Sequence, residues 1–460
     1  MKTQSLLQYG CSHPIATLSA LFLAWKSLLL LIVLTSPGLG YDTSSSLLAI
    51  GEYETATRNL SGTPKQIENP WLKFVRWDAI YFTQMAEHGH VFEQEWAFGI
   101  GLSSTVSWIA KILASIMHVD NSISFTVAGV SVAHVAHWLA AVQVWAIASH
   151  LLDGGSKKPS QSQSSVPFLA AVMHILSPAG AFLSTPNTES LFACLSFSGF
   201  LAFLSATAQF NHAKILRGAA TMVAAGLAFG SATLIRSNGI LAGIPFLIEA
   251  VTLALAVLSQ GVSLSRLVRL VSVVVGGLLV AAGMVFPQFL AYQEYCAGRT
   301  PGQRRQWCEW TIPSIFTFVQ SHYWDVGAFR YWTLSNLPLF LLAAPTLWIL
   351  IQSAIEVMRK PDMVRGESQS SSAGTSTSTK QQILVAASLA LPQLLLAVLA
   401  FTSYHVQIIT RISSGYPLWY IWLAAKTRSQ ETKNASVIIR WMIIYALVQA
   451  GLYASFLPPA

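Results

Sequence analysis

The chain has 460 residues and a formal net charge of +8, with 53% hydrophobic and only 10% charged residues. Because a soluble domain carries about 25% charged residues, this composition excludes a soluble enzyme and a disordered protein. The lysines and arginines form no basic run with interleaved aromatic residues, so the charge does not indicate nucleic-acid binding. Four cysteines are too few for a disulfide scaffold. The composition therefore predicts an all-α polytopic membrane protein.

A helix needs about 20 apolar residues to cross the hydrocarbon core of a bilayer. Eleven stretches are candidates, the tenth of them short: Ile15–Leu34, Ile123–Leu151, Val166–Leu183, Leu191–Ala208, Gly218–Ile235, Gly239–Leu258, Leu270–Leu290, Leu334–Ile355, Ile383–Phe401, Ile412–Ala425 and Val437–Phe456. The amphipathic stretch Gly101–Met117 carries Lys111 and is expected to lie in the membrane without crossing it. We expect a single membrane-embedded domain over residues 1–460, built as a bundle of about eleven transmembrane helices.

Lysines and arginines are concentrated in alternate loops, which the positive-inside rule assigns to the cytosol. Two of these loops, 153–165 and 366–382, are rich in Ser, Gly and Thr and are expected to be disordered. The N-terminus is then cytosolic, and Ile15–Leu34 is a retained first helix. A cleaved signal peptide is the alternative, because Lys26 interrupts the apolar run and Pro37–Gly40 is a small-residue stretch.

The opposite side of the membrane receives two long loops, 36–102 and 291–333, which are rich in aromatic and charged residues. Loops of this length between helices are often functional. We therefore expect chemistry outside the cytosol, with a solvated cap on a transporter as the alternative. The first long loop also contains a glycosylation sequon at Asn59.

Two acidic residues on this side are candidates for catalysis. Asp78 lies in the aromatic run Arg76–Phe82, where a carboxylate is costly unless it is paired or used. A desolvated carboxylate beside aromatic rings suits a general base, while an ion pair with Arg76 or a helix cap is the structural alternative. Glu189 follows a short polar turn and is the second candidate. The structural alternative is that Glu189 only stabilises the first turn of a helix, where the helix dipole favours an acid.

Three arginines lie on the side where the positive-inside rule disfavours them, namely Arg236, Arg330 and Arg411. The guanidinium fork matches phosphate oxygens, so these arginines predict a site for a lipid phosphate at the membrane edge. Snorkelling at the interface is the alternative for each of them. His405 is a candidate donor at the same edge, or else a structural hydrogen-bonding residue.

Motifs for other chemistries are absent from the sequence. It contains no Walker loop, no GxGxxG motif after a strand and no HExxH motif. His134 and His137 fall on one membrane helix and are interpreted as core residues. We therefore predict no metal site and no cofactor, and leave assistance by a divalent ion open.

Five segments, in order over Trp71–Trp422, make the chain similar to the GPI mannosyltransferase II (PIG-V) family. They are Arg76–Phe82 with Glu93–Phe98, Ser177-Pro178 with Glu189–Ala193, Arg236–Gly239, Phe318–Trp332, and His405–Arg411. No single segment is decisive, but five in order on one topological face are strongly specific.

The resemblance implies a membrane glycosyltransferase of the GT-C type in the endoplasmic reticulum, with a luminal active site and both long loops in the lumen. It would transfer the second mannose, through an α-1,6 bond, from dolichol-phosphate mannose to a GPI-anchor precursor. The reaction would be an inverting single displacement, in which one base suffices. Membrane lipids are further expected partners, nucleic acid is not, and a small accessory membrane subunit is left open. In the lumen, Cys296 and Cys308 are expected to form a disulfide.

The site residues implied by the resemblance follow the same segments. Asp78 is expected to be the base, and Glu189 to be the alternative base or a residue that positions the acceptor. Substrate contacts are expected from Arg76, Trp77, Glu93, Arg236, Asn238, Tyr323, Trp324, Arg330, His405, Gln407 and Arg411.

Two other functions remain as alternatives: another transferase that uses dolichol-phosphate mannose, and a lipid or solute transporter without chemistry. A transporter would be expected to place charged residues at mid-membrane depth and to show internal repeats. The charges of this chain gather at one surface, and no repeat is evident. The charge pattern therefore favours the enzyme.

Overall fold

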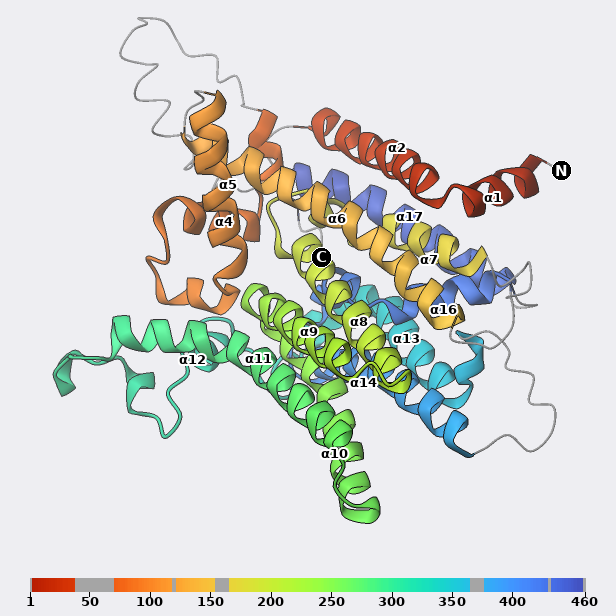
Figure 1. Ribbon diagram of the computed structural model, residues 1–460. Helices are drawn as coiled ribbons and strands as arrows, with labels where there is room; N and C mark the ends of the chain where they lie inside the picture. Colours follow the sequence, from red (N-terminus) through yellow and green to blue (C-terminus); the bar gives the residue numbers. More distant parts are fainter. Residues whose placement is uncertain are drawn as a thin grey trace, which may run out of the picture.

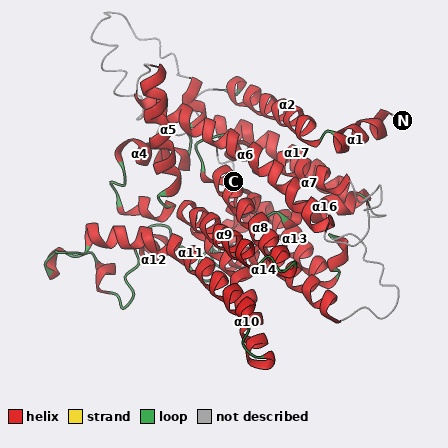
Figure 2. Cartoon of the chain, in the orientation of Figure 1, coloured by secondary structure: helices red, strands yellow, loops and turns green. Residues whose placement is uncertain are grey.

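The computed structural model describes residues 2–37, 70–117, 121–153, 165–364, 376–428 and 432–457, which form helices and connecting loops without a strand (Figure 2). Asn59 and most of the first long loop lie outside these residues, as do residues 154–164 and 366–375 of the two expected cytosolic loops. The helix α14 begins at Ser376, so it extends into the range 366–382 that was expected to be disordered.

Nine helices in the described part are long and apolar enough to cross a membrane (Figure 1). Each coincides with one of the predicted spans: α2 (Pro14–Thr35), α6 (Asn121–Asp153), α8 (Thr188–Asn211), α9 (Ile215–Ile235), α10 (Gly243–Gln260), α11 (Leu264–Tyr295), α13 (Leu337–Arg359), α14 (Ser376–Thr402) and α17 (Thr432–Ala454). The all-helical, multi-pass prediction is therefore confirmed. Shorter helices connect or flank them: α1 (Lys2–Ser12), α4 (Asp78–His88), α5 (Gly101–Met117), α7 (Val166–Ile175), α12 (Ile315–His322), α15 (Ile409–Ile412) and α16 (Leu418–Thr427).

Two predicted spans, Val166–Leu183 and Ile412–Ala425, are not continuous helices. The first ends as α7 at Ile175, because Pro178 disfavours the helical conformation of the residue before it. The chain then forms the 3₁₀ helix η5 (Gly180–Leu183) and a polar turn that leads into α8. The second span is divided into α15, the 3₁₀ helix η12 (Ser413–Gly415) and α16, with Pro417 at the start of α16. These two predictions of a single crossing helix are wrong.

The two irregular segments lie inside the protein and support one another. Tyr420 of α16 donates a hydrogen bond to Ser177 after α7, with 2.9 Å between the two oxygens. Every residue from Ser177 to Ser190 is buried. Non-helical backbone at membrane depth is tolerated only where protein covers its polar groups. Within the helix bundle, the polar turn 184–190 lies next to α15, where Glu189 bonds to Arg411.

Glycines allow α9 and α11 to approach closely. A Cβ atom added at Gly226 would collide with the backbone of Gly276, and one at Gly230 would lie 2.5 Å from the carbonyl oxygen of Leu279. Small residues at such positions let helix backbones pack without the bulk of side chains. This packing holds α9 against α11 and so places the C-terminal end of α9, where Arg236 follows, beside the base of the second long loop.

The second long loop (291–333) folds onto the described part of the first, residues 70–102. Cys296 and Cys308 form a disulfide with 5.6 Å between their Cα atoms. The Trp307 side chain is fully buried and donates from Nε1 to Oε1 of Glu93 at 3.1 Å. Glu93 begins the 3₁₀ helix η3 (Glu93–Phe98) in the first loop. These contacts hold α12 and η3 together at the same end of the bundle as α4 (Figure 1).

The remaining 3₁₀ helices are connections of three to six residues: η2 (Pro70–Phe74), η6 (Ser237–Ala242), η7 (Pro301–Gln303), η8 (Gln306–Glu309), η9 (Leu334–Asn336), η10 (Pro361–Met363) and η11 (Val406–Ile408). Two of them border the site: η6 directly follows Arg236, and η11 leads from His405 to α15.

Candidate active site

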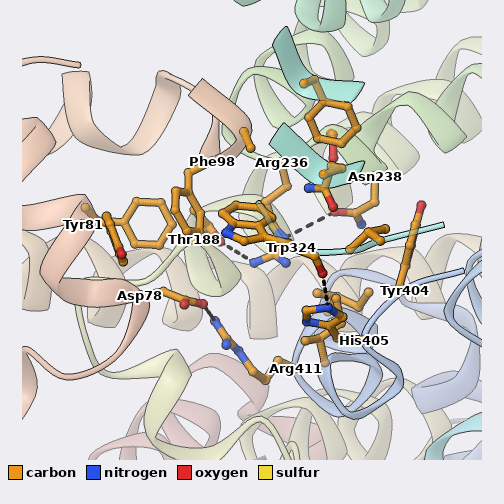
Figure 3. Close-up of a pocket in the computed structure, with 18 residues that line it drawn as sticks. Asp78, Tyr81, Phe98, Thr188, Arg236, Asn238, Trp324, Tyr404, His405 and Arg411 are labelled. Carbon is orange, nitrogen blue, oxygen red and sulfur yellow. Dashed lines mark hydrogen bonds and ion pairs between the residues drawn. The ribbon is translucent and has the colours of Figure 1, made fainter. Parts of the chain in front are cut away.

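A cavity of about 340 Å³ lies where the two long loops meet the ends of α8, α9 and α14 (Figure 3). It is lined by Asp78, Tyr81, Phe82, Ala97, Phe98, Thr188, Arg236, Ser237, Asn238, Phe316, Gln320, Trp324, Val326, Tyr404, His405, Ile408, Arg411 and Ile412. This volume falls in the range of roughly 300–1,000 Å³ that is typical of small-molecule sites. Six of the residues expected in the site line the cavity: Asp78, Arg236, Asn238, Trp324, His405 and Arg411.

Asp78 is the first residue of α4 and the acidic residue of the cavity wall. Its side chain is 36% exposed, and Oδ2 lies 2.9 Å from Nη2 of Arg411. The preceding residue, Trp77, has a φ of +56°, a region that non-glycine residues seldom occupy. This backbone turn redirects the chain at the start of α4, so that the carboxylate enters the cavity.

Arg76 does not have the expected position. Its side chain is fully buried, and the guanidinium carbon lies 5.1 Å from the centre of the Phe456 ring. It does not line the cavity, and Arg411 takes the place beside Asp78 that was expected for Arg76. Trp77 likewise packs on Phe456, at 5.2 Å between ring centres. The reason is the turn at Trp77, which sends residues 76 and 78 in different directions.

Glu189 lies behind the cavity wall in the first turn of α8, with 0% of its side chain exposed. Oε1 lies 2.8 Å from Nη2 and 2.9 Å from Nε of Arg411, and 3.1 Å from Nη1 of Arg236. A buried carboxylate requires such partners, because desolvation of an unpaired charge is costly. Glu189 therefore holds two arginines at fixed positions and does not line the cavity itself.

Arg411 joins both acids. Its guanidinium carbon also lies 3.7 Å from the centre of the Phe182 ring, a cation–π contact. Burial by itself would lower the pKa of Arg411, but the carboxylates of Glu189 and Asp78 raise it above its ordinary value. The guanidinium is thus a permanent charge, and Figure 3 shows the Asp78 carboxylate paired with it. Through Arg411, Asp78 is held close to Glu189.

Arg236 forms the opposite wall. Nε donates to Oδ1 of Asn238 at 3.3 Å, and Nη1 donates to Glu189 and to the hydroxyl of Thr188. Asn238 is held in turn by Tyr416, with 3.1 Å between Nδ2 and the phenol oxygen. Burial lowers the pKa of Arg236, while the Glu189 carboxylate acts in the opposite direction. Arginine nonetheless stays charged. No hydrogen bond is formed by Nη2 of Arg236 within the described part, so its protons remain available at the cavity.

Aromatic side chains form the third wall. The rings of Tyr81 and Phe98 are stacked with 5.4 Å between centres, and Trp324 lies 5.1 Å from Phe98. Nε2 of His405 lies 2.9 Å from the carbonyl oxygen of Trp324. Since a carbonyl only accepts, this nitrogen carries the proton. His405, stacked on the ring of Tyr331 at 4.7 Å, thereby fixes the position of Trp324.

Four other expected contacts lie away from the cavity. Glu93 accepts hydrogen bonds from Trp307 and from Tyr323 and pairs with Arg305 at 3.3 Å, so it fastens the two long loops together. Burial and the Glu93 charge raise the pKa of Tyr323. Arg330 is exposed and lies 3.2 Å from the exposed Asp325. Neither Arg330 nor Gln407 lines the cavity.

Several cavity residues were not expected from the sequence. Tyr81 and Phe82 were inside a noted motif, and a helix beginning at Asp78 would have indicated them, since residues three and four apart share a face. Thr188 directly precedes Glu189. Gln320 lies inside the segment Phe318–Trp332, and Tyr404 directly precedes the segment His405–Arg411. No group of three or more metal-binding side chains occurs among the described residues.

A family model described as mannosyltransferase (PIG-V) matches residues 16–460. The chain belongs to the PIG-V mannosyltransferase family. The resemblance found in the five segments is therefore confirmed, and this PIG-V protein is a glycosyltransferase. It is 41% identical over 459 residues to GPI mannosyltransferase 2 of Aspergillus fumigatus, covering 97% of this chain and 94% of the relative. It is 42% identical to GPI mannosyltransferase 2 of Gibberella zeae, covering 99% of this chain and 100% of the relative.

Among solved structures, this PIG-V protein matches an Archaeoglobus fulgidus oligosaccharyltransferase tethered with an acceptor peptide. The TM-score is 0.43 at 12% identity, over 89% of this chain and 55% of that chain.

Proposed function

We propose that this PIG-V protein transfers the second mannose, through an α-1,6 bond, from dolichol-phosphate mannose to a GPI-anchor precursor. The observation that carries the proposal is the cavity, whose described lining has one accessible carboxylate, Asp78, and an arginine, Arg236, with Nη2 bonded to none of the described residues. Transfer from a lipid phosphate requires these two groups: a base for the acceptor hydroxyl, and a cation for the phosphate that leaves.

Arg236 and Asn238 form the donor side of the cavity in this proposal. The Nη2 protons of Arg236 bind a phosphate oxygen of the donor and stabilise the charge that grows there as the sugar leaves. Arg411 contributes positive potential, but it is paired with two carboxylates, Asp78 and Glu189, whereas Arg236 is paired with Glu189 alone. The structure thus favours Arg236 over Arg411 as the direct phosphate ligand.

Asp78 and the aromatic wall form the acceptor side. Tyr81 and Phe82 share α4 with Asp78, and aromatic faces suit the apolar faces of a sugar. Asp78 takes the proton of the acceptor mannose hydroxyl, and the oxygen of that hydroxyl attacks the anomeric carbon of the donor. The bond between that carbon and the phosphate oxygen breaks, and dolichyl phosphate leaves with the electron pair. One displacement inverts the configuration, so a β-linked donor yields an α-linked product.

Glu189 acts through the arginines and not as the base. A group with no exposed surface behind the cavity wall cannot reach an acceptor hydroxyl, whereas it sets the positions of both guanidinium groups. The reaction as proposed uses no cofactor.

The endoplasmic reticulum membrane is the proposed location, with the cavity facing the lumen. The Cys296–Cys308 disulfide fits an oxidising compartment. The positive-inside rule assigns the basic loops at the other end of the helices to the cytosol.

The decisive experiment measures mannose transfer by the full-length protein in membranes, with labelled dolichol-phosphate mannose and a one-mannose GPI precursor. We expect a two-mannose product that an α-1,6-specific mannosidase shortens. Transfer only to other dolichol-linked or protein acceptors would support the alternative transferase. Movement of the labelled lipid between leaflets without any new glycosidic bond would support a transporter, and either result would refute the proposal.

A further inference from the structure

The hydroxyl of Tyr453 connects two segments that carry the acids of the site. Tyr453 lies near the C-terminal end of α17 and is fully buried. Its oxygen lies 3.1 Å from the carbonyl oxygens of Phe74 and of Arg76, and 3.3 Å from the amide nitrogen of Arg76. It also lies 3.4 Å from Nδ2 of Asn187. The single hydroxyl proton is donated to the carbonyls, and the oxygen accepts from the Arg76 amide and from Asn187.

Each of these contacts is a short distance along the chain from a charged group of the site. The carbonyl of Arg76 also accepts the amide of Ala79 at 3.1 Å, a bond in the turn that opens α4 at Asp78. Asn187 is the N-cap residue of α8, and Glu189 lies in the first turn of that helix. One buried hydroxyl thus bridges the backbone that leads into Asp78 and the turn that leads into Glu189.

The ring of Tyr453 adds a third connection. It packs edge-on against Phe182, with 5.2 Å between ring centres. The guanidinium carbon of Arg411 also contacts the Phe182 ring, at 3.7 Å from its centre. The left-handed backbone of Trp77, next to Arg76, persists only where its surroundings determine it. Tyr453 helps to hold this backbone, because its hydroxyl bonds to the peptide groups on either side of Val75.

We infer that Tyr453 is a positioning residue, which sets the distance between the Asp78 carboxylate and the Glu189–Arg411 pair. It does not line the cavity, so it acts only through these segments. The inference rests on the proposed function, because Asp78 must be the base for its position to affect the rate. A small displacement of a reacting group costs rate far more than it costs binding.

The test replaces Tyr453 with Phe, which removes the hydroxyl and keeps the ring against Phe182. In the transfer assay with the full-length protein, we expect kcat of Y453F to fall roughly 10- to 100-fold. The KM values for donor and acceptor should stay within about twofold, since no substrate contact is lost. The matched control is Ser353→Ala, which removes another fully buried hydroxyl, bonded to Gln393 between α13 and α14, away from the cavity. We expect S353A to keep its kcat.

A second variant tests the bridge from the other side. Asn187→Ala removes the amide that reaches Tyr453 and that also donates to the hydroxyl of Thr185. The double variant N187A/Y453F should lose less than the sum of the two single losses, because the Asn187–Tyr453 contact is already absent from each single variant. Y453F with normal kcat, or S353A with an equal loss, would overturn the inference. If Y453F does not fold, N187A decides: a normal kcat for N187A refutes the bridge. Absence of transfer by the unaltered protein would instead refute the proposed function.

Discussion

Arg411 lies between two carboxylates of unequal accessibility, with one nitrogen, Nη2, 2.9 Å from Asp78 and 2.8 Å from Glu189. Asp78 is 36% exposed and faces the cavity, whereas Glu189 is fully enclosed. The same arginine thus contacts an enclosed acid on one side and, on the other, the acid that we propose as the base. This asymmetry separates the roles of the two acids, which have the same chemistry.

The first prediction concerns Asp78→Asn. The amide keeps the shape of the carboxylate but cannot accept a proton, so mannose transfer should fall roughly 10²- to 10⁴-fold, the usual span for a lost general base. Asp78→Glu should also be impaired, because one added methylene displaces the carboxylate. Transfer is measured at matched protein amounts, with thermal unfolding as a control that should change little. Full activity of D78N would contradict the assignment.

The second prediction concerns Glu189→Gln, which should reduce stability as well as activity. It removes the charge that compensates Arg411 and Arg236 in a buried setting, and breaking a buried pair in this way costs about 3–5 kcal/mol. The unfolding midpoint of detergent-solubilised E189Q should therefore lie below that of D78N. Equal midpoints for the two variants, with a larger loss of kcat in E189Q, would make Glu189 the better candidate for the base.

The third prediction concerns the donor phosphate. Arg236→Ala should lower kcat/KM for the donor by roughly 10- to 100-fold, since a charge-assisted hydrogen bond contributes about 1.5–3 kcal/mol. Arg236→Lys should recover part of the loss through its charge, without the bidentate geometry. Arg330→Ala is the matched control, because Arg330 is an exposed arginine paired with Asp325 outside the cavity. Equal effects of R236A and R330A would mean that neither arginine selects the donor.

The fourth prediction concerns the Cys296–Cys308 disulfide. Closing a loop of this size contributes about 3 kcal/mol in the chain-entropy model. Cys308→Ser should therefore lower the unfolding midpoint and weaken transfer, because the same loop carries Phe316, Gln320 and Trp324 of the cavity wall. A reducing agent should act on the unaltered protein in the same direction. Cys11→Ser removes a free cysteine of α1 and should have no effect. Rapid thiol labelling of both Cys296 and Cys308 in the native protein would contradict the bond.

The fifth prediction concerns the contact between α9 and α11. Gly226→Ala places a Cβ atom against the backbone of Gly276, which cannot move aside as a flexible side chain would. Overpacking of this kind costs about 1–3 kcal/mol, so the unfolding midpoint should fall. In Gly277→Ala, the new Cβ atom lies 3.5 Å from Phe246, an ordinary contact, and the midpoint should stay unchanged. If both substitutions are tolerated equally, close packing of these helices is not limiting.

Hydropathy and charge pattern predicted the long helices well. Nine of the predicted spans are continuous helices, because the free energy of burying an apolar run is a sum over neighbouring residues that the sequence itself contains. The two failures, at α7 and α16, are segments where proline, glycine and hydroxyl residues interrupt an apolar run. A hydropathy average over about 20 residues hides such interruptions, whereas the helix itself ends at them.

The sequence by itself determined the membrane character, the family and the segments in which Asp78, Arg236 and Arg411 occur. Only the tertiary structure decided which of these residues meet. Asp78 pairs with Arg411 and not with its neighbour Arg76, because the turn at Trp77 separates adjacent side chains while helix packing brings α15 to α4. The tertiary structure also encloses Glu189, and it places Glu93 where its hydrogen bond with Trp307 joins the two long loops. Local sequence specifies helices and turns, but charged partners are chosen by the whole bundle, since a buried charge is stable only where a distant segment supplies its counter-charge.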